Sequence, residues 1–188
     1  MTLAGSVLQY LLKPARELSN PTQELSSNYE GKVIKVTDGD SITILNARNE
    51  KVRVRLTGID APEADQPYGQ ESKKNLASMV AGKEVSIETN KTDRYGRVLG
   101  KVWVQPADCP SCGKTVNTNH AQILSGMAWW YRQYANDQSA EDQGRYESAE
   151  DEARQRRWGL WSEPNPVAPW DWRRGARAEL IEGCGEKQ

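Results

Sequence analysis

The 188-residue sequence contains no phenylalanine and only one histidine, His120. Nothing in the sequence resembles a Ser-His-Asp arrangement, and the glycine-rich phosphate loop of nucleotide hydrolases is also missing. His120 falls within a predicted helix and is interpreted as a structural residue. No apolar run is long enough to cross a bilayer, so no membrane partner is predicted. Carboxylates and arginines are therefore the candidates for catalytic chemistry.

A strong excess of charge of one sign is also missing. The sequence has 25 Lys and Arg against 26 Asp and Glu, a formal net charge of -1. Proteins that bind nucleic acid often carry an overall positive charge, so any attraction for phosphate must be local here. Basic residues do gather in two stretches, at 51–55 and 91–101. Charge alone favours the simpler interpretation that these are solvated strand faces.

The three cysteines are Cys109, Cys112 and Cys184. The Cys-Pro-Ser-Cys-Gly turn that begins at Cys109 is compatible with a disulfide, a reduced turn or half of a zinc site. A structural zinc site requires four ligands, and Cys184 and His120 are the remaining candidates of that type. They would complete a site only if the C-terminal tail folded back. Structural Zn²⁺ at Cys109 and Cys112 is therefore the least favoured alternative.

The length of the chain favours one domain with tails. Residues 1–28 are predicted to form a short helix that ends at Pro14, followed by a linker. Residues 29–162 are the predicted main domain, and residues 163–188 an irregular C-terminal tail. Lys13 follows the first apolar stretch instead of preceding it, so this stretch makes a poor signal peptide. The compartment stays open on this basis.

Within the main domain, β-branched runs at 32–36 and 41–45 flank an Asp-Gly pair at Asp38 and Gly39. This pattern is a strong hairpin signal. Apolar and basic residues alternate over 51–56 and predict a third strand. Two more strands are predicted at 85–89 and 98–104, and helices at 70–80, at 119–127 and from Ser139 to Gly159.

Five short strands without a β-α-β rhythm argue against a parallel sheet. A small antiparallel barrel, OB-like and Greek-key, with about three helices is the predicted fold, in the α+β class. Barrels of this kind often bind nucleic acids.

Acidic and basic residues follow the predicted strand ends. Asp40 follows the hairpin glycine, and Asp60 and Glu63 lie in the loop after the third strand. Oxygen ligands without nearby His or Cys suit Ca²⁺ or Mg²⁺ better than zinc. Arg55 leaves the third strand and Arg97 ends a polar turn, and arginine suits bidentate contact with phosphate. Each residue alone has a simpler explanation, as a turn former, a surface acid or an ion-pair partner.

The combination is more informative than any member. Phosphodiester hydrolysis needs a metal to hold an oxygen, a group that deprotonates water, and cations for the charge on phosphorus. Two aspartates, one glutamate and two arginines supply these parts. With no His or Cys in the set, the role of general base falls to Glu63.

At these residues the sequence resembles the staphylococcal nuclease (thermonuclease) family, as a bacterial-type single-domain homologue. Three segments carry the resemblance in the family's order: Val36–Ser41, Val54–Glu63 and Thr92–Arg97. Residues 117–130 and 157–161 also resemble its later helices, so the likeness covers about 31–172. It implies an OB-like barrel and a calcium-dependent endonuclease that cleaves DNA and RNA and leaves 3'-phosphate ends.

The resemblance also implies roles for individual residues. One Ca²⁺ ion is expected on Asp40, Asp60 and the carbonyl of Ala61, with Glu63 as base and Arg55 and Arg97 on the phosphate. Substrate binding is expected at Arg94, Tyr95, Tyr131 and Tyr134.

The sequence departs from the family's pattern in three places. Ala61 stands where threonine is common. Trp129, Trp130 and Tyr131 occupy a region where other members present tyrosines to a base. The cysteine turn falls in what the family treats as a plain hairpin.

The competing interpretation is a non-catalytic nucleic-acid-binding module built on the same barrel. The enzyme is favoured because all five positions expected for catalysis carry the expected residues, which are Asp40, Arg55, Asp60, Glu63 and Arg97. The expected partners are DNA and RNA substrates, and the protein is expected to be a monomer. The family tends to be secreted or periplasmic, but the localisation is left unknown.

Overall fold

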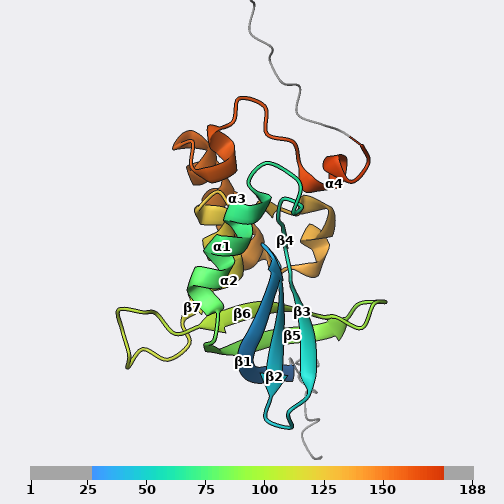
Figure 1. Cartoon of the computed structure of the whole chain (residues 1–188). Helices are drawn as coiled ribbons and strands as arrows, with labels where there is room; N and C mark the ends of the chain where they lie inside the picture. The colour runs from blue at the N-terminus through green and yellow to red at the C-terminus, as the bar shows by residue number, and fades with distance from the viewer. Residues whose placement is uncertain (1–26, 176–188) are drawn as a thin grey trace, which may run out of the picture.

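The computed structural model of the chain describes residues 27–175. Five of its strands form a barrel: β1 (Ser27–Asp38), β2 (Ser41–Asn46), β3 (Lys51–Leu56), β5 (Glu84–Thr92) and β6 (Val98–Val104). Their order is β3-β2-β1-β5-β6, and β3 pairs with β6 to close the barrel (Figure 1). The predicted five-stranded barrel is confirmed, although the closing pair is parallel, so the barrel is mixed and not purely antiparallel. The predicted N-terminal helix lies outside the described residues.

β1 and β2 form the predicted hairpin, with Asp38 opposite Ser41. Register shifts after Val33 and after Val36 mark two irregularities in β1. Its early residues pair with β5, while its later residues pair with β2. Bulges bend a strand and increase its twist, which lets one strand serve two sides of a small barrel.

The helices gather at one end of the barrel (Figure 1). They are α1 (Gly69–Val80), α2 (Thr118–Leu124), α3 (Ala140–Gln155) and the short α4 (Pro169–Trp172). Two 3₁₀ helices, at Arg132–Asp137 and Gly159–Ser162, and the two-residue strand β7 (Val116–Asn117) complete the connections. A second, two-stranded sheet pairs β4 (Ile59–Asp60) with β8 (Trp129–Trp130). This small sheet ties the loop after β3 to the segment that leads into α3.

The inward faces of the strands and helices build one core. Val54 and Leu56 of β3 are buried while Lys51 and Arg53 are exposed, as the alternation in the sequence predicts. The fully buried core side chains include Ile42, Ile44, Leu76, Val80, Val85, Ile87, Val102, Ile123 and Tyr146. His120 lies half-buried on α2, with its ring centroid 6.3 Å from that of Tyr146. Among residues 27–175, no helix is long and apolar enough to span a bilayer.

Two local predictions about α3 have different outcomes. Ser139 caps the helix by accepting a hydrogen bond from the Asp142 N–H at 3.1 Å, as the capping box predicts. The helix ends at Gln155, however, and not near Gly159. Arg157 adopts a left-handed backbone with φ 55°, which is incompatible with a continuing right-handed helix.

The cysteine turn lies between β6 and β7, and Cys109 and Cys112 form a disulfide with a Cα–Cα distance of 5.4 Å. Of the three alternatives, the structure therefore has the disulfide. Its two sulfurs are bonded to each other and are not thiolate ligands for zinc. Cys184 lies outside the described residues.

Glu150 on α3 is a buried acid that holds the second sheet. Its carboxylate accepts a hydrogen bond from the Trp130 N–H at 2.9 Å and pairs with Arg132 at 2.5 Å and Arg154 at 3.1 Å. Glu150→Ala is expected to lower the free energy of unfolding by about 2–4 kcal/mol, measured by urea denaturation. The expected loss of stability is moderate because both arginines are partly exposed and water screens their charges.

Glu150→Gln is the matched control, because it keeps an acceptor for the Trp130 N–H while removing the charge. A smaller loss than in the alanine variant is expected. Equal losses in the two variants would show that the hydrogen bond to Trp130 contributes nothing.

Candidate active site

A cleft of about 960 Å³ opens at the ends of the barrel strands. The residues that line it come from the β1–β2 turn, the end of β3, the loop after β4, the β5–β6 turn and the segment after β8. All of the acids and arginines singled out in the sequence line this cleft: Asp40, Asp60, Glu63, Arg55 and Arg97. The barrel thus brings together residues that are up to 57 positions apart in the chain.

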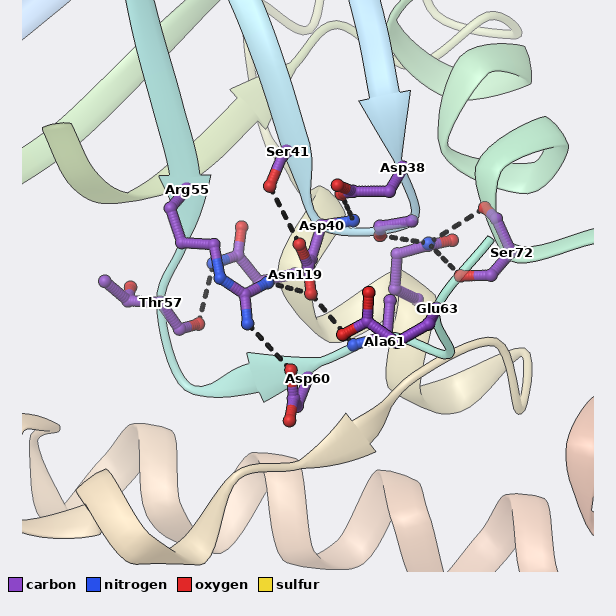
Figure 2. Close-up of polar contacts among 12 residues, drawn as sticks. Asp38, Asp40, Ser41, Arg55, Thr57, Asp60, Ala61, Glu63, Ser72 and Asn119 are labelled. Atoms are coloured by element: carbon purple, nitrogen blue, oxygen red, sulfur yellow. Dashed lines mark hydrogen bonds and ion pairs between the residues drawn. The ribbon is translucent and has the colours of Figure 1, made fainter. Parts of the chain in front are cut away.

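Asp40 is buried and fixed from several directions (Figure 2). Its Oδ2 accepts a hydrogen bond from the Ala61 N–H at 2.9 Å, and its Oδ1 accepts one from the Ser41 hydroxyl at 2.9 Å. The preceding Gly39 carbonyl accepts a hydrogen bond from the buried Gln122 amide of α2 at 2.6 Å. The hairpin turn is therefore anchored to the helical layer and to the loop that carries Asp60.

Arg55 lies between the two aspartates (Figure 2). Its guanidinium pairs with Asp40 and with Asp60, the latter at 2.8 Å between Nη2 and Oδ1. Burial lowers the pKa of Arg55, and the carboxylates of Asp60 and Asp38 oppose that shift. The buried cation offsets the repulsion between two buried carboxylates and fixes their separation.

Glu63 lies at the edge of the same cleft, with about 40% of its side chain exposed. Its N–H donates to Gln66 Oε1 at 3.1 Å, and its carbonyl accepts from the Gln66 N–H at 3.0 Å. Gly69 passes so close that a Cβ there would lie 1.8 Å from the Glu63 carbonyl oxygen. The backbone of Glu63 is thus held in place while its carboxylate stays accessible to water.

Arg97, Arg94 and Tyr95 belong to the turn between β5 and β6. Asp93 organises this turn: its Oδ2 accepts from Arg97 Nε at 2.8 Å, and its Oδ1 accepts from the Arg97 and Tyr95 N–H groups at 2.9 Å each. Burial opposes the shift, but these hydrogen bonds outweigh it and lower the pKa of Asp93. The sequence offered an ion pair with Asp93 as the simpler explanation of Arg97, and the structure has that pair; Arg97 also lines the cleft.

Tyr131 and Tyr134 form an aromatic wall of the cleft. Their ring centroids are 5.0 Å apart in an edge-to-face arrangement. The Tyr131 N–H donates to the Gly58 carbonyl at 2.9 Å, which extends the pairing of β4 with β8. Partial burial and the nearby carboxylate of Asp60 raise the pKa of Tyr131.

Arg173 is a cleft residue that the sequence analysis missed. It follows α4, within the tail predicted to be irregular, and its Nη2 lies 2.7 Å from Asp60 Oδ2. Its Nη1 lies 2.7 Å from Glu63 Oε1. No local pattern in the sequence signals this contact, because it joins residues 113 and 110 positions apart.

The ligand chemistry of the acids fits a hard divalent cation. Asp40 and Asp60 are buried oxygen ligands on adjoining loops, and Ala61 lies between Asp60 and Glu63. Over residues 27–175 there is no group of three or more His, Cys, Asp or Glu side chains spaced to hold a metal ion. A site here would therefore combine two carboxylates with backbone carbonyl and water oxygens, ligands that Ca²⁺ accepts readily.

Comparison with known proteins identifies the class. Residues 53–163 match the family described as staphylococcal nuclease homologue. An OB-like barrel with this match is a barrel nuclease. The chain belongs to the staphylococcal nuclease family, as the three motifs in the sequence indicate.

Several curated relatives are similar over most of their length. Protein ParB of Escherichia coli is 41% identical over 153 residues, which cover 81% of this chain and 84% of the relative. Micrococcal nuclease of Shigella flexneri is also 41% identical over 153 residues, 80% of this chain and 84% of the relative. An uncharacterized endonuclease of Escherichia coli is 40% identical over 149 residues, 79% of this chain and 88% of the relative.

The close approach of Gly69 to Glu63 gives a test of how the site is positioned. Gly69→Ala is expected to push the Glu63 backbone away and to lower nuclease turnover by about 10- to 100-fold. Thermal unfolding of the same variant is expected to report a loss of about 1–3 kcal/mol from overpacking.

Gly144→Ala on α3 is the control, because a Cβ at Gly144 meets nothing within 4 Å. It is expected to leave turnover unchanged and to raise stability by up to about 1 kcal/mol. A Gly69→Ala variant with unchanged turnover would contradict the role of this close contact.

Proposed function

We propose that this protein is a calcium-dependent endonuclease that hydrolyses phosphodiester bonds in DNA and RNA and leaves 3'-phosphate ends. The observation that carries the proposal is the convergence of Asp40, Asp60 and Glu63 with Arg55 and Arg97 in one cleft. Membership of the staphylococcal nuclease family supports the reaction class, and the relative named micrococcal nuclease supports it further.

We assign the metal to Asp40, Asp60 and the carbonyl of Ala61. Bound there, Ca²⁺ supplies positive charge that polarises a phosphate oxygen. The protein contributes two buried carboxylates whose positions are fixed by Arg55, Ser41 and the Ala61 N–H. Fixed ligands lower the cost of organising a site during the reaction.

Glu63 is assigned as the general base. Its carboxylate is partly exposed, so a water molecule can reach it, and its backbone is held by Gln66 and by the packing of Gly69. In the proposed reaction Glu63 accepts a proton from the attacking water, and the water oxygen bonds to phosphorus. The bond between phosphorus and the 5'-oxygen breaks, the 5'-oxygen takes a proton from solvent water, and the phosphate stays on the 3' side.

Arg55 and Arg97 are assigned to the reacting phosphate. Negative charge grows on the phosphoryl oxygens as water attacks, and guanidinium groups stabilise it through charge-assisted hydrogen bonds. Arg55 already bridges the two aspartates, and Arg97 lies close enough for its charge to contribute to the lowered pKa of Arg55. The two cations therefore act on the same region of the cleft.

Substrate capture is assigned to Arg94, Tyr95, Tyr131 and Tyr134. Arg94 lies 4.8 Å from the centroid of the Tyr95 ring, and Tyr95 and Tyr134 are exposed. Exposed aromatic rings stack on bases with little sequence preference, and neighbouring arginines attract the phosphate backbone. The near-neutral net charge leaves this capture to local groups.

The first test addresses metal and base together. Wild-type protein incubated with single-stranded DNA and Ca²⁺ is expected to release fragments with 3'-phosphate ends, and a chelator is expected to stop the release. Glu63→Gln is expected to lower turnover by at least about 100-fold while the thermal midpoint stays close to wild type. Cleavage that persists both with chelator and in the Glu63→Gln variant would contradict the proposed mechanism, in which calcium and Glu63 are both required.

Binding measured on the same samples separates the enzyme from a non-catalytic module. A wild-type protein that retains DNA in Ca²⁺ without cleaving it would support the module instead.

The second test addresses Arg97. Arg97→Ala is expected to lower turnover by about 100- to 1,000-fold, as measured by single-turnover kinetics on a labelled oligonucleotide. Arg156→Ala is the matched control, because Arg156 is exposed at the C-terminal cap of α3, pairs with Glu152 and does not line the cleft. Equal single-turnover cleavage rates in the two variants would show that Arg97 does not take part in the reaction.

A further inference from the structure

The segment Val167–Arg174, here called the C-terminal strap, lies against the cleft and is held at both of its ends. Gln66 Nε2 donates a hydrogen bond to the Val167 carbonyl at 2.6 Å. Trp172 Nε1 donates to Asp65 Oδ1 at 3.3 Å. The strap therefore docks on the loop that carries Asp60 and Glu63.

Arg173 reaches from the strap onto the acids of the site. Its guanidinium donates to both oxygens of Asp60, at 3.3 and 2.7 Å, and to Glu63 Oε1 at 2.7 Å. Burial disfavours its charged form, but the hydrogen bonds that it donates to Asp60 and Glu63 outweigh this and raise its pKa. Arg173 is thus a cation that spans the assigned metal ligand and the assigned base.

The charges explain why this contact competes with a metal. The three assigned acids, Asp40, Asp60 and Glu63, have a formal charge of -3, and Arg55, which pairs with both aspartates, brings the formal charge of this set of four to -2. That balance suits a divalent cation. Arg173 reduces it to -1 and occupies oxygens of Asp60 that a metal would need.

A second strap residue covers the aromatic wall. The Trp170 and Tyr131 rings are stacked, with centroids 5.3 Å apart and planes at 9°. Trp170 also packs edge-on against Trp129, with a centroid distance of 5.6 Å. A nucleobase cannot use the face of Tyr131 that Trp170 covers.

We propose that the C-terminal strap is an autoinhibitory element, in which Arg173 stands in for the divalent cation and Trp170 stands in for a nucleobase. Metal and substrate bind fully only when the strap leaves the cleft. This inference rests on the proposed function, because it assigns calcium to Asp60.

The strap has the features of a reversible element. About 43% of the Arg173 side chain and 40% of the Glu63 side chain are exposed, and ion pairs in water are weak. The helix α4 has four residues, too few to be stable without docking. A ligand that binds only the open state loses affinity in proportion to the closed fraction.

Calcium binding to the full chain, measured by isothermal titration calorimetry, tests the inference. Arg173→Ala is expected to bind Ca²⁺ about tenfold more tightly than wild type, a difference of about 1.4 kcal/mol. Arg174→Ala is the matched control, because Arg174 is its neighbour, is exposed, and pairs with Asp171 on the strap. Its affinity is expected to equal that of wild type.

Hydrogen exchange of the wild-type protein supplies a second measurement that needs no variant. The N–H groups of Asp171, Trp172 and Arg173 donate to carbonyls within the strap. Saturating Ca²⁺ is expected to speed their exchange about tenfold or more, because the released helix unfolds.

Tighter binding in Arg173→Ala alone, with faster exchange on calcium addition, supports the strap as a competitor. Equal or weaker binding in Arg173→Ala, or exchange unchanged by saturating Ca²⁺, overturns it while leaving the proposed nuclease intact. No calcium binding in any of the three proteins overturns the cofactor assignment and the strap competition together.

Discussion

The arrangement of the site depends on one buried cation, Arg55. Two buried carboxylates on different loops repel each other in a medium of low dielectric constant, and the guanidinium between them offsets that repulsion. Arg55 lies at the end of a barrel strand, so the rigid sheet sets its position. The β1–β2 turn and the loop of β4 are then aligned to it by Asp40 and Asp60. The rigid barrel fixes the position of Arg55, and the ion pairs of Arg55 then fix the distance between Asp40 and Asp60.

Around this arrangement lie polar residues that do not line the cleft but hold its backbone in place. Gln122 donates a hydrogen bond to the Gly39 carbonyl. Asn119 donates to the Thr57 carbonyl at 2.9 Å (Figure 2) and to the Gly100 carbonyl at 3.2 Å. Both are buried residues of α2. The helical layer therefore does more than cover the core, because it fixes the turn before Asp40 and the end of β3, which carries Arg55. Buried amides that satisfy these backbone carbonyls also restrict the backbone there to one conformation.

Local signals were enough to predict the barrel strands. The Asp-Gly turn, the alternation at 51–56 and the capping box at Ser139 each depend on neighbouring residues and appear in the structure as predicted. The sequence also predicted that the site residues lie close together, because they stand at strand ends and match the motifs of the family. The pairing of β4 with β8 was not predictable in this way, because two-residue strands carry no periodicity. Arg173 was not predicted, because its contact with Asp60 depends on how the C-terminal tail docks on the cleft. The Pro- and Trp-rich sequence of this tail predicted an irregular segment and did not predict the short helix α4.

The small sheet of β4 and β8 has a consequence for redesign of the enzyme. Asp60 lies opposite Trp129, and Ile59 lies opposite Trp130, directly before Tyr131. Backbone hydrogen bonds thus join the loop of acids to the aromatic wall across two residues. Variants of the wall must keep this register, since a slip of one residue would turn the Asp60 side chain to the opposite face of the sheet. The positions of the wall and of the acids are therefore coupled through the backbone, and substitutions are safer there than insertions or deletions.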